Sequence, residues 1–157
     1  MPTVAEGAKA PDFTLPNQDR TPVTLSDELK KGPVVLAFFP GAFSGTCTNE
    51  MCTFRDSMSE FDRGSARLVG VSTDTFFALK AWADAQRFTF PLLSDYNKTV
   101  IEQYGVVNPD MIGLKNIAKR AVFVIDRNGV VQYREVLDDA RNEPDYGKVR
   151  ATIGRLQ

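Results

Sequence analysis

The sequence VVLAFFPGAFSGTCTNEMCTF, residues 34–54, carries the pattern that decides the fold. Its first part, Val34–Phe39, is an unbroken apolar run rich in β-branched and aromatic residues, which predicts a buried strand. A segment rich in glycine, proline and serine follows, and from Cys47 onward apolar side chains recur at spacings of four and three. That spacing continues to Phe61 and predicts an amphipathic helix over 47–62. A buried strand that leads through a turn into an amphipathic helix is typical of α/β folds.

The rest of the chain continues this alternation of strands and helices. Apolar segments with strand character recur at Leu68–Ser72 and Ala121–Ile125. The turn residues 126–129 predict an antiparallel hairpin that joins Ala121–Ile125 to Val130–Glu135. Periodic apolar residues predict further helices over 75–87, 97–104 and 144–156. We therefore expect one α/β domain over residues 1–157, with a central mixed β-sheet flanked by helices. Two short segments, Asp12–Leu15 and Val23–Leu25, predict an N-terminal β-hairpin extension.

Composition excludes several kinds of chemistry. The 157 residues carry a formal charge of −1, so neither nucleic acid nor an anionic membrane is an expected partner. The chain has no histidine, which removes Ser-His and Cys-His catalytic pairs and histidine-based metal sites. Two cysteines cannot build a four-thiolate metal site, so we expect neither a metal nor a cofactor. No apolar run could span a bilayer and no signal peptide is visible, so the expected location is the cytoplasm.

A cysteine at the start of the helix predicted over 47–62 indicates nucleophilic or redox chemistry. Cys47 falls in the first turn, where unpaired backbone N–H groups and the helix dipole favour an anion. The thiolate is the reactive form of cysteine, and it is stabilised in such positions. From its place on the apolar stripe alone, Cys47 could equally be a small core residue.

Four separate motifs resemble those of the peroxiredoxin family. Pro40, Ser44 and Cys47 match the family's active-site pattern Pro-x-x-x-Thr/Ser-x-x-Cys. Glu50 and Phe54-Arg-Asp56 extend this first motif in the family's pattern. The other three motifs are Ser72-Thr-Asp-Thr-Phe76 with Trp82, Phe90-Pro-Leu-Leu-Ser-Asp95, and Arg120-Ala-Val-Phe-Val-Ile-Asp126. They occur in the family's order and span almost the whole chain. The resemblance implies a thioredoxin-like fold and an enzyme that reduces hydroperoxides with a thiol.

The resemblance also implies roles for individual residues. Cys47 would be the peroxidatic thiolate, which attacks the peroxide and becomes a sulfenic acid. Arg120 would stabilise the thiolate and the reacting oxygens, and Ser44 would hydrogen-bond the peroxide. Backbone amides near Thr46 and Cys47 would complete the polar pocket. Pro40 would line that pocket and limit the access of water.

Two of the site residues leave a question open. Glu50 would orient Arg120, although an acidic residue near the start of a helix is favourable by itself. Most of the family has threonine where this chain has Ser44, so the methyl group that restricts the side-chain rotamer is lost. That departure bears on how firmly a substrate is held and not on whether the chemistry occurs.

Cys52 follows Cys47 by five residues, a spacing that resembles the bacterioferritin-comigratory (PrxQ) branch of the family. In that branch the second cysteine resolves the sulfenic acid into a disulfide, and the expected reductant is thioredoxin or a similar dithiol protein. On an intact helix the two Cα atoms would lie ~8–9 Å apart, whereas a disulfide needs about 7 Å or less. The disulfide therefore requires local unwinding near residues 44–54. Alternatively, Cys52 is a spectator in a one-cysteine enzyme.

Two other functions fit the same fold. A thiol–disulfide oxidoreductase usually has Cys-x-x-Cys, whereas four residues separate the cysteines here. A non-enzymatic holdase or interaction module would have no use for the arrangement of Pro40, Cys47 and Arg120. The spacing and the residues around the thiol therefore favour a peroxidase.

Three further segments complete the expectations. Gly105–Lys119, which contains Pro109 and Gly113, is expected to be a loop at the substrate entrance. The charged run Arg134–Lys148 is expected to be solvated. Four aromatic residues have two possible places: an apolar patch beside the active site, or the interior of the monomer. They are Phe43, Phe76, Phe77 and Trp82. Both a monomer and a homodimer therefore stay open.

Overall fold

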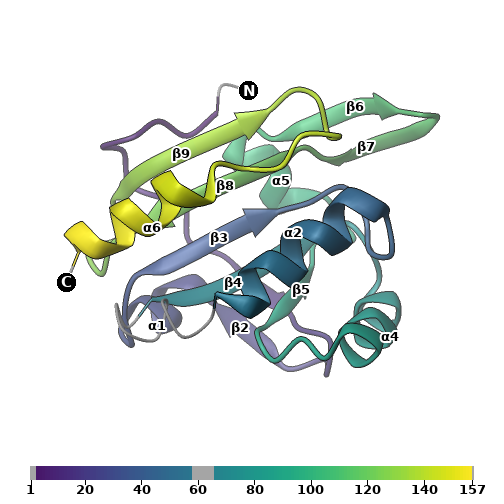
Figure 1. Ribbon diagram of the computed structural model, residues 1–157, viewed down its shortest axis with the longest axis horizontal. Helices are drawn as coiled ribbons and strands as arrows, with labels where there is room; N and C mark the ends of the chain where they lie inside the picture. The colour runs from purple at the N-terminus through teal and green to yellow at the C-terminus, as the bar shows by residue number, and fades with distance from the viewer. Residues whose placement is uncertain (1–2, 58–65, 157) are drawn as a thin grey trace.

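The computed structural model describes residues 3–57 and 66–156. Within them, a central sheet has the strand order β5-β4-β3-β8-β9 (Figure 1). These strands are β3 (Val34–Phe38), β4 (Arg67–Ser72), β5 (Leu92–Ser94), β8 (Arg120–Ile125) and β9 (Val131–Leu137). β3, β4 and β5 are parallel, whereas β8 is antiparallel to both β3 and β9. The sheet is therefore mixed, which confirms the predicted fold class.

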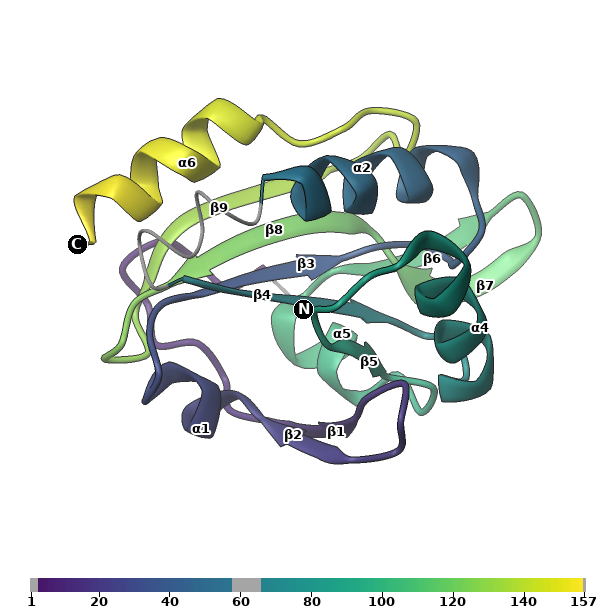
Figure 2. The same ribbon diagram turned by 60° about the horizontal axis from the view of Figure 1, so that its bottom comes forward.

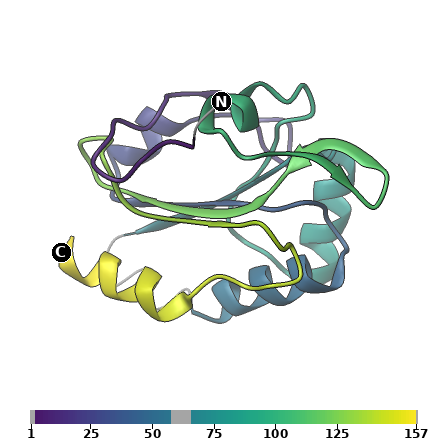
Figure 3. The ribbon, with the colours of Figure 1, turned by 90° about the horizontal axis from the view of Figure 1, so that it is seen from above.

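Helices cover both faces of this sheet because its central strand is apolar on both sides. Along β3, Leu36 and Phe38 enter one buried cluster, while Val35 and Ala37 enter the other. The alternation follows from the two-residue period of a strand. On one face lie α2 (Gly45–Asp56), α4 (Phe76–Gln86) and α6 (Tyr146–Arg155), and on the other α1 (Leu25–Leu29) and α5 (Thr99–Tyr104) (Figures 2 and 3). Among the described residues, no helix is long and apolar enough to cross a membrane.

The elements predicted from periodicity are present with shifted ends. The N-terminal hairpin is formed by β1 (Thr14–Pro16) and β2 (Pro22–Thr24), which pair antiparallel. The helix predicted over 47–62 is described as far as Asp56, with Ser57 as its C-cap, and its predicted part beyond residue 57 lies outside the described residues. α6 begins after the N-cap residue Asp145, so Pro144 precedes the helix and does not lie in its first turn.

The prediction of a loop over Gly105–Lys119 is wrong. This segment contains an antiparallel hairpin formed by β6 (Val107–Met111) and β7 (Leu114–Ala118). Pro109 lies inside β6, although a proline in the sequence is evidence against a strand because it has no N–H for the ladder. The two turn residues are Ile112 and Gly113, which both have positive φ, whereas hairpins of this kind usually start the turn with Asn, Asp or Gly.

Candidate active site

The loop between β3 and α2 is held in place by the end of the neighbouring strand β4. Asp74 Oδ2 accepts hydrogen bonds from the backbone N–H of Ala42 at 2.8 Å and from the Ser72 hydroxyl at 2.7 Å. β4 is parallel to β3, so both strands end at the same edge of the sheet. The loop that precedes α2 is thereby fixed by a side chain 32 residues away in the sequence.

Cys47 lies in the first turn of α2, as predicted, and it is 0% exposed. The N-cap residue is Ser44, but its side chain does not cap the helix. The Ser44 hydroxyl instead donates a hydrogen bond to the carbonyl of Gly41 at 2.9 Å. The first-turn N–H groups of α2 therefore receive no side-chain cap from Ser44, and they add to the positive potential at this end of the helix.

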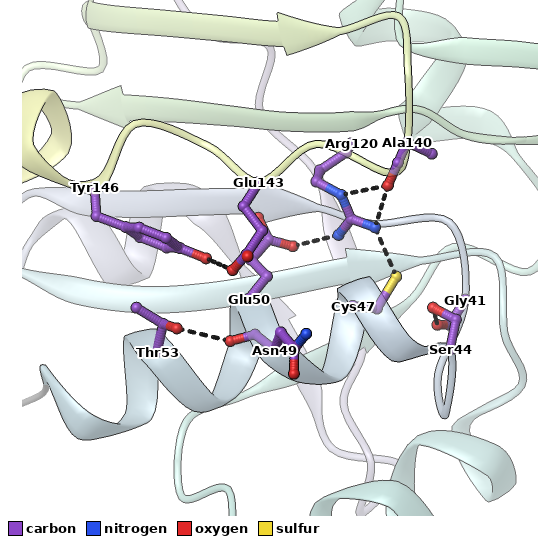
Figure 4. Close-up of polar contacts among 10 residues, drawn as sticks. All are labelled: Gly41, Ser44, Cys47, Asn49, Glu50, Thr53, Arg120, Ala140, Glu143 and Tyr146. Carbon is purple, nitrogen blue, oxygen red and sulfur yellow. Dashed lines mark hydrogen bonds and ion pairs between the residues drawn. The ribbon is translucent and has the colours of Figure 1, made fainter.

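Arg120 brings a buried guanidinium to the sulfur of Cys47. β8 pairs with β3 so that Ala121 faces Phe38, which places the first residue of β8 beside the end of β3. Arg120 is 1% exposed, and its Nη2 donates to the Cys47 sulfur at 3.2 Å (Figure 4). Its Nη1 donates to Glu50 Oε1 at 2.7 Å. A residue from a distant strand and two from α2 thus form one buried cluster.

Burial controls the electrostatics of the Arg120–Glu50 pair. Burial raises the pKa of Glu50 to about 7, and the attraction of Arg120 opposes this rise without cancelling it. Nearby Glu143 and Glu135 raise it further. Among the described residues, Glu50 Oε2 has no hydrogen-bond partner, which adds to the cost of the charged form. For Arg120, burial alone would lower the pKa, but the charges of Glu50 and Cys47 raise it above its usual value.

The alternative explanation for an acidic residue at position 50, a favourable place at the start of the helix, does not hold. α2 begins at Gly45, and its first turn contains no acidic residue. Glu50 lies in the second turn, 0% exposed and paired with Arg120. Its position is therefore explained by the contact with Arg120 and not by the helix dipole.

An open cleft of about 680 Å³ reaches this cluster. Its walls come from the start of α2, the β6–β7 hairpin, Arg120 and the segment after β9. The lining residues are Pro40, Ser44, Gly45, Thr46, Asn108, Asp110, Met111, Ile112, Arg120 and the four residues 138–141. Although it is a hairpin and not a loop, the segment 105–119 does border the cleft. Cys47 itself lies beneath the wall and is buried.

Cys52 lies on the same helix as Cys47, and both are free thiols. Its sulfur is 3.6 Å from Gln86 Oε1, to which the thiol can donate a weak hydrogen bond. Cys52 is partly buried and packs beside the cluster that contains Cys47. On an intact helix their Cα atoms are ~8–9 Å apart, which is beyond disulfide reach.

Several contributors to the site were not predicted from the sequence. Arg120 Nε and Nη2 donate to the carbonyl oxygen of Ala140 at 3.2 and 3.0 Å. A backbone carbonyl carries no residue-type signal, and Ala140 falls in the charged run that was expected to be solvated. Trp82 is 0% exposed, and its indole N–H donates to Thr48 Oγ1 on α2 at 3.3 Å. It therefore belongs to the interior, while Phe43 and Phe77 are exposed.

A mixed sheet flanked by helices, with a helix-start cysteine against a buried arginine, defines the class of thiol peroxidases with a thioredoxin-like fold. The sequence matches the AhpC/TSA family over residues 7–134, and the chain belongs to this family. It is an enzyme of the peroxiredoxin type.

Named relatives and solved structures agree with this assignment. Alkyl hydroperoxide reductase E of Mycobacterium bovis is 39% identical over 132 residues, which are 83% of this chain and 84% of the relative. The chloroplastic peroxiredoxin Q of Sedum lineare is 40% identical over 129 residues, which are 82% of this chain and 67% of the relative. The crystal structure of the peroxidoxin BcpB from Mycobacterium tuberculosis has a TM-score of 0.88 at 38% identity and covers 97% of both chains.

Proposed function

We propose that the protein reduces hydroperoxides in a thiol cycle that begins at Cys47. The observation that carries this proposal is the 3.2 Å contact between Arg120 Nη2 and the Cys47 sulfur. A guanidinium at this distance favours the thiolate, and in a buried site its charge is little screened. Its fixed planar donors can also meet the negative charge that develops on the peroxide oxygens.

In the first step the Cys47 thiolate attacks the outer oxygen of the hydroperoxide ROOH. A sulfur–oxygen bond forms while the oxygen–oxygen bond breaks, and the leaving oxygen takes a proton to become ROH. Cys47 is left as a sulfenic acid. Ser44 and Thr46 line the cleft at the start of α2, where a hydroxyl and backbone amides can bind the peroxide oxygens. The buried ring of Pro40 closes one side against water.

In the second step the Cys52 thiol attacks the sulfenic sulfur, and a disulfide forms with release of water. The helix geometry of α2 requires its first turns to unwind before the two sulfurs can meet. A dithiol protein such as thioredoxin then reduces the disulfide by exchange and is itself oxidised. The cycle starts with both thiols reduced, which agrees with a reducing compartment such as the cytoplasm.

The cleft supports organic hydroperoxides as well as hydrogen peroxide. Its wall includes the side chains of Met111 and Ile112 on the β6–β7 hairpin. Ile112 is 90% exposed, so this apolar surface is free to contact the carbon group of a substrate.

Intact mass after a single turnover tests this cycle. Reduced protein is mixed with one equivalent of hydrogen peroxide, and its mass is recorded within seconds for the wild type, Cys52→Ser and Cys47→Ser. We expect the wild type to lose two hydrogens, Cys52→Ser to gain an oxygen, and Cys47→Ser to stay unchanged. If the wild type gains oxygen as Cys52→Ser does, Cys52 is not the resolving thiol. If none of the three reacts faster than a free thiol, the proposed function is wrong.

A further inference from the structure

The guanidinium of Arg120 is held by a backbone carbonyl that could not be predicted from the sequence. Glu50 accepts from Nη1, but Nε and Nη2 both donate to the carbonyl oxygen of Ala140. Nη2 is also the nitrogen that contacts the Cys47 sulfur. Of its two hydrogens, one is directed to the Ala140 carbonyl and the other to the sulfur. The position of the Ala140 carbonyl therefore sets the direction in which Nη2 presents its second hydrogen to the Cys47 sulfur (Figure 4).

The Ala140 carbonyl belongs to a turn that Asp139 closes in three ways. The backbone N–H of Asn142 donates to the Asp139 carbonyl at 3.1 Å. The backbone N–H of Arg141 donates to Asp139 Oδ1 at 3.0 Å. The Arg141 guanidinium also binds the same carboxylate, with Nη2 at 2.8 Å from Oδ2.

One of these contacts acts on the peptide unit that faces the active site. The Ala140 carbonyl and the Arg141 N–H belong to a single planar peptide, in which they point in opposite directions. The carboxylate of Asp139 holds the N–H end, and the guanidinium of Arg120 binds the carbonyl end. Rotation of this peptide would break both contacts at once.

We propose that Asp139 is a positioning residue: it fixes the Ala140–Arg141 peptide plane and, through it, the guanidinium of Arg120. The inference rests on the proposed function in one respect, which is that Arg120 stabilises the Cys47 thiolate. Asp139 lines the cleft, but the hydrogen bonds of its carboxylate go to Arg141 and not to the Cys47 sulfur or to Arg120. Its effect reaches the thiol through one peptide and one guanidinium.

Removal of Asp139 has two effects that predict opposite changes in the ionisation of Cys47: the loss of its negative charge, and the loss of its hold on the Ala140–Arg141 peptide. A carboxylate near the site disfavours a second negative charge, so charge alone predicts an easier ionisation of Cys47 once Asp139 is gone. Loss of the fixed carbonyl weakens the contact between Arg120 and the sulfur, which predicts a harder ionisation. The neighbouring Asp138 is the matched control, because it lines the same cleft and carries the same charge. It is exposed and pairs with Lys119 at 3.3 Å.

The test measures thiolate absorbance in the ultraviolet against pH, in a Cys52→Ser background so that Cys47 is the one titrating cysteine. We expect Asp139→Ala to move the midpoint upward by about one pH unit, and Asp138→Ala to leave it in place or lower it. Asp139→Asn keeps an oxygen for the Arg141 N–H and should restore the midpoint. Hydrogen bonds from Arg141 lower the pKa of Asp139 to about 2, so its charge is constant during the titration.

The proposal is overturned if Asp139→Ala leaves the midpoint unchanged or lowers it as Asp138→Ala does. It is also overturned if Asp139→Asn shifts the midpoint as far as Asp139→Ala. The asparagine variant keeps the turn, so it remains informative if the alanine variant folds poorly. The absorbance needs no peroxide, so a failure of the proposed peroxidase reaction would be seen separately, in the single-turnover mass experiment.

Discussion

At the scale of single residues, Arg120 connects everything that the site needs. Its fork of donors reaches a carboxylate, a carbonyl and a sulfur at the same time. A lysine carries the same charge but has one nitrogen, which cannot hold three partners in these directions. We expect Arg120→Lys to lower the second-order rate with hydrogen peroxide on the order of 100-fold, measured by stopped-flow mixing.

The control for Arg120→Lys is Arg55→Lys. Arg55 lies on the same helix as Cys47 and donates to the Gln86 carbonyl, away from the sulfur. The Arg55 side chain is 33% exposed, so its replacement tests a change of arginine to lysine on this helix outside the buried cluster. It should alter the rate by less than about threefold, because no contact to the Cys47 thiol is lost. Equal losses in both variants would mean that the helix, and not the guanidinium at the thiol, determines the rate.

Side chains of the site could be predicted from the sequence far better than their backbone partners. Pro40, Ser44, Cys47 and Arg120 belong to motifs, and the structure brings all four to one end of α2. The Ala140 carbonyl could not be predicted, because any residue type supplies a carbonyl. The burial of Glu50 could not be predicted either, because a charged residue is normally exposed unless a partner from elsewhere in the fold reaches it.

At the scale of elements, α2 must change shape if Cys52 resolves the sulfenic acid. Trp82 on α4 reports on this change, because its indole N–H donates to Thr48 between the two cysteines. Trp82 is the one tryptophan of the chain, so its fluorescence has a single source. We expect peroxide to produce a fast phase and then a slower fluorescence change as the disulfide forms and α2 unwinds. Stopped-flow fluorescence measures both phases.

The slower phase should be absent in Cys52→Ser, which stops at the sulfenic acid. Hydrogen exchange of amides 44–54 gives an independent check, since unwound turns exchange faster. Equal protection in the reduced and the oxidised wild type, together with identical fluorescence traces in the variant, would contradict unwinding.

The β6–β7 hairpin has a strained residue at its tip that faces the cleft. Ile112 has φ 49°, which is rare for a β-branched residue, and it is 90% exposed. Ile112→Asn places a preferred residue in this turn and removes the apolar surface. We expect the hairpin to become more stable while kcat/KM for cumene hydroperoxide falls roughly 3- to 10-fold relative to hydrogen peroxide. Steady-state assays with the two substrates measure the ratio.

Leu114→Asn serves as the matched control for the hairpin. Leu114 is apolar and 51% exposed on the same hairpin, but it does not line the cleft. Its replacement should leave the ratio of the two substrates unchanged. A ratio that falls equally in both variants would contradict a specific contact of Ile112 with the substrate, because the two variants share only the loss of apolar surface on the hairpin.

Elements with a long period were predicted well, whereas short ones were predicted only in part: the hairpin β1–β2 and the helix α5 were expected, but β5 and α1 were not. The strands β3, β4 and β8 are apolar runs buried on both sides, and α4 and α6 span three turns or close to it. β5 has three residues and α1 has five, which is too short for a period to be recognised. The hairpin β6–β7 was missed because Pro109 and Ile112 contradict the usual residue preferences, and tertiary pairing overrides them.

At the scale of the whole molecule, we propose that the chain unfolds as one cooperative domain. Its two apolar clusters lie on opposite faces of one sheet and share the strands β3 and β8. Neither cluster can be lost without exposing residues of the same strands. We expect coincident denaturant transitions by Trp82 fluorescence, which reports one face, and by far-ultraviolet circular dichroism. Two separate midpoints would contradict a single domain.

The buried Arg120–Glu50 pair makes the stability of the whole fold depend on pH. The pKa of Glu50 is raised by burial to about 7 from an ordinary value of 4.5, so between these pH values the folded protein holds a proton that the unfolded chain has released. Stability therefore falls as the pH rises from about 4.5 to about 7, by up to roughly 3 kcal/mol.

Glu50→Gln keeps the shape of the side chain but cannot titrate. We expect the free energy of unfolding of the wild type, minus that of Glu50→Gln, to decrease across this window and to level off above it. Urea titrations at a series of pH values measure this difference. A difference that rises with pH would mean that Glu50 is fully ionised in the fold, and that its attraction to Arg120 outweighs the cost of burial.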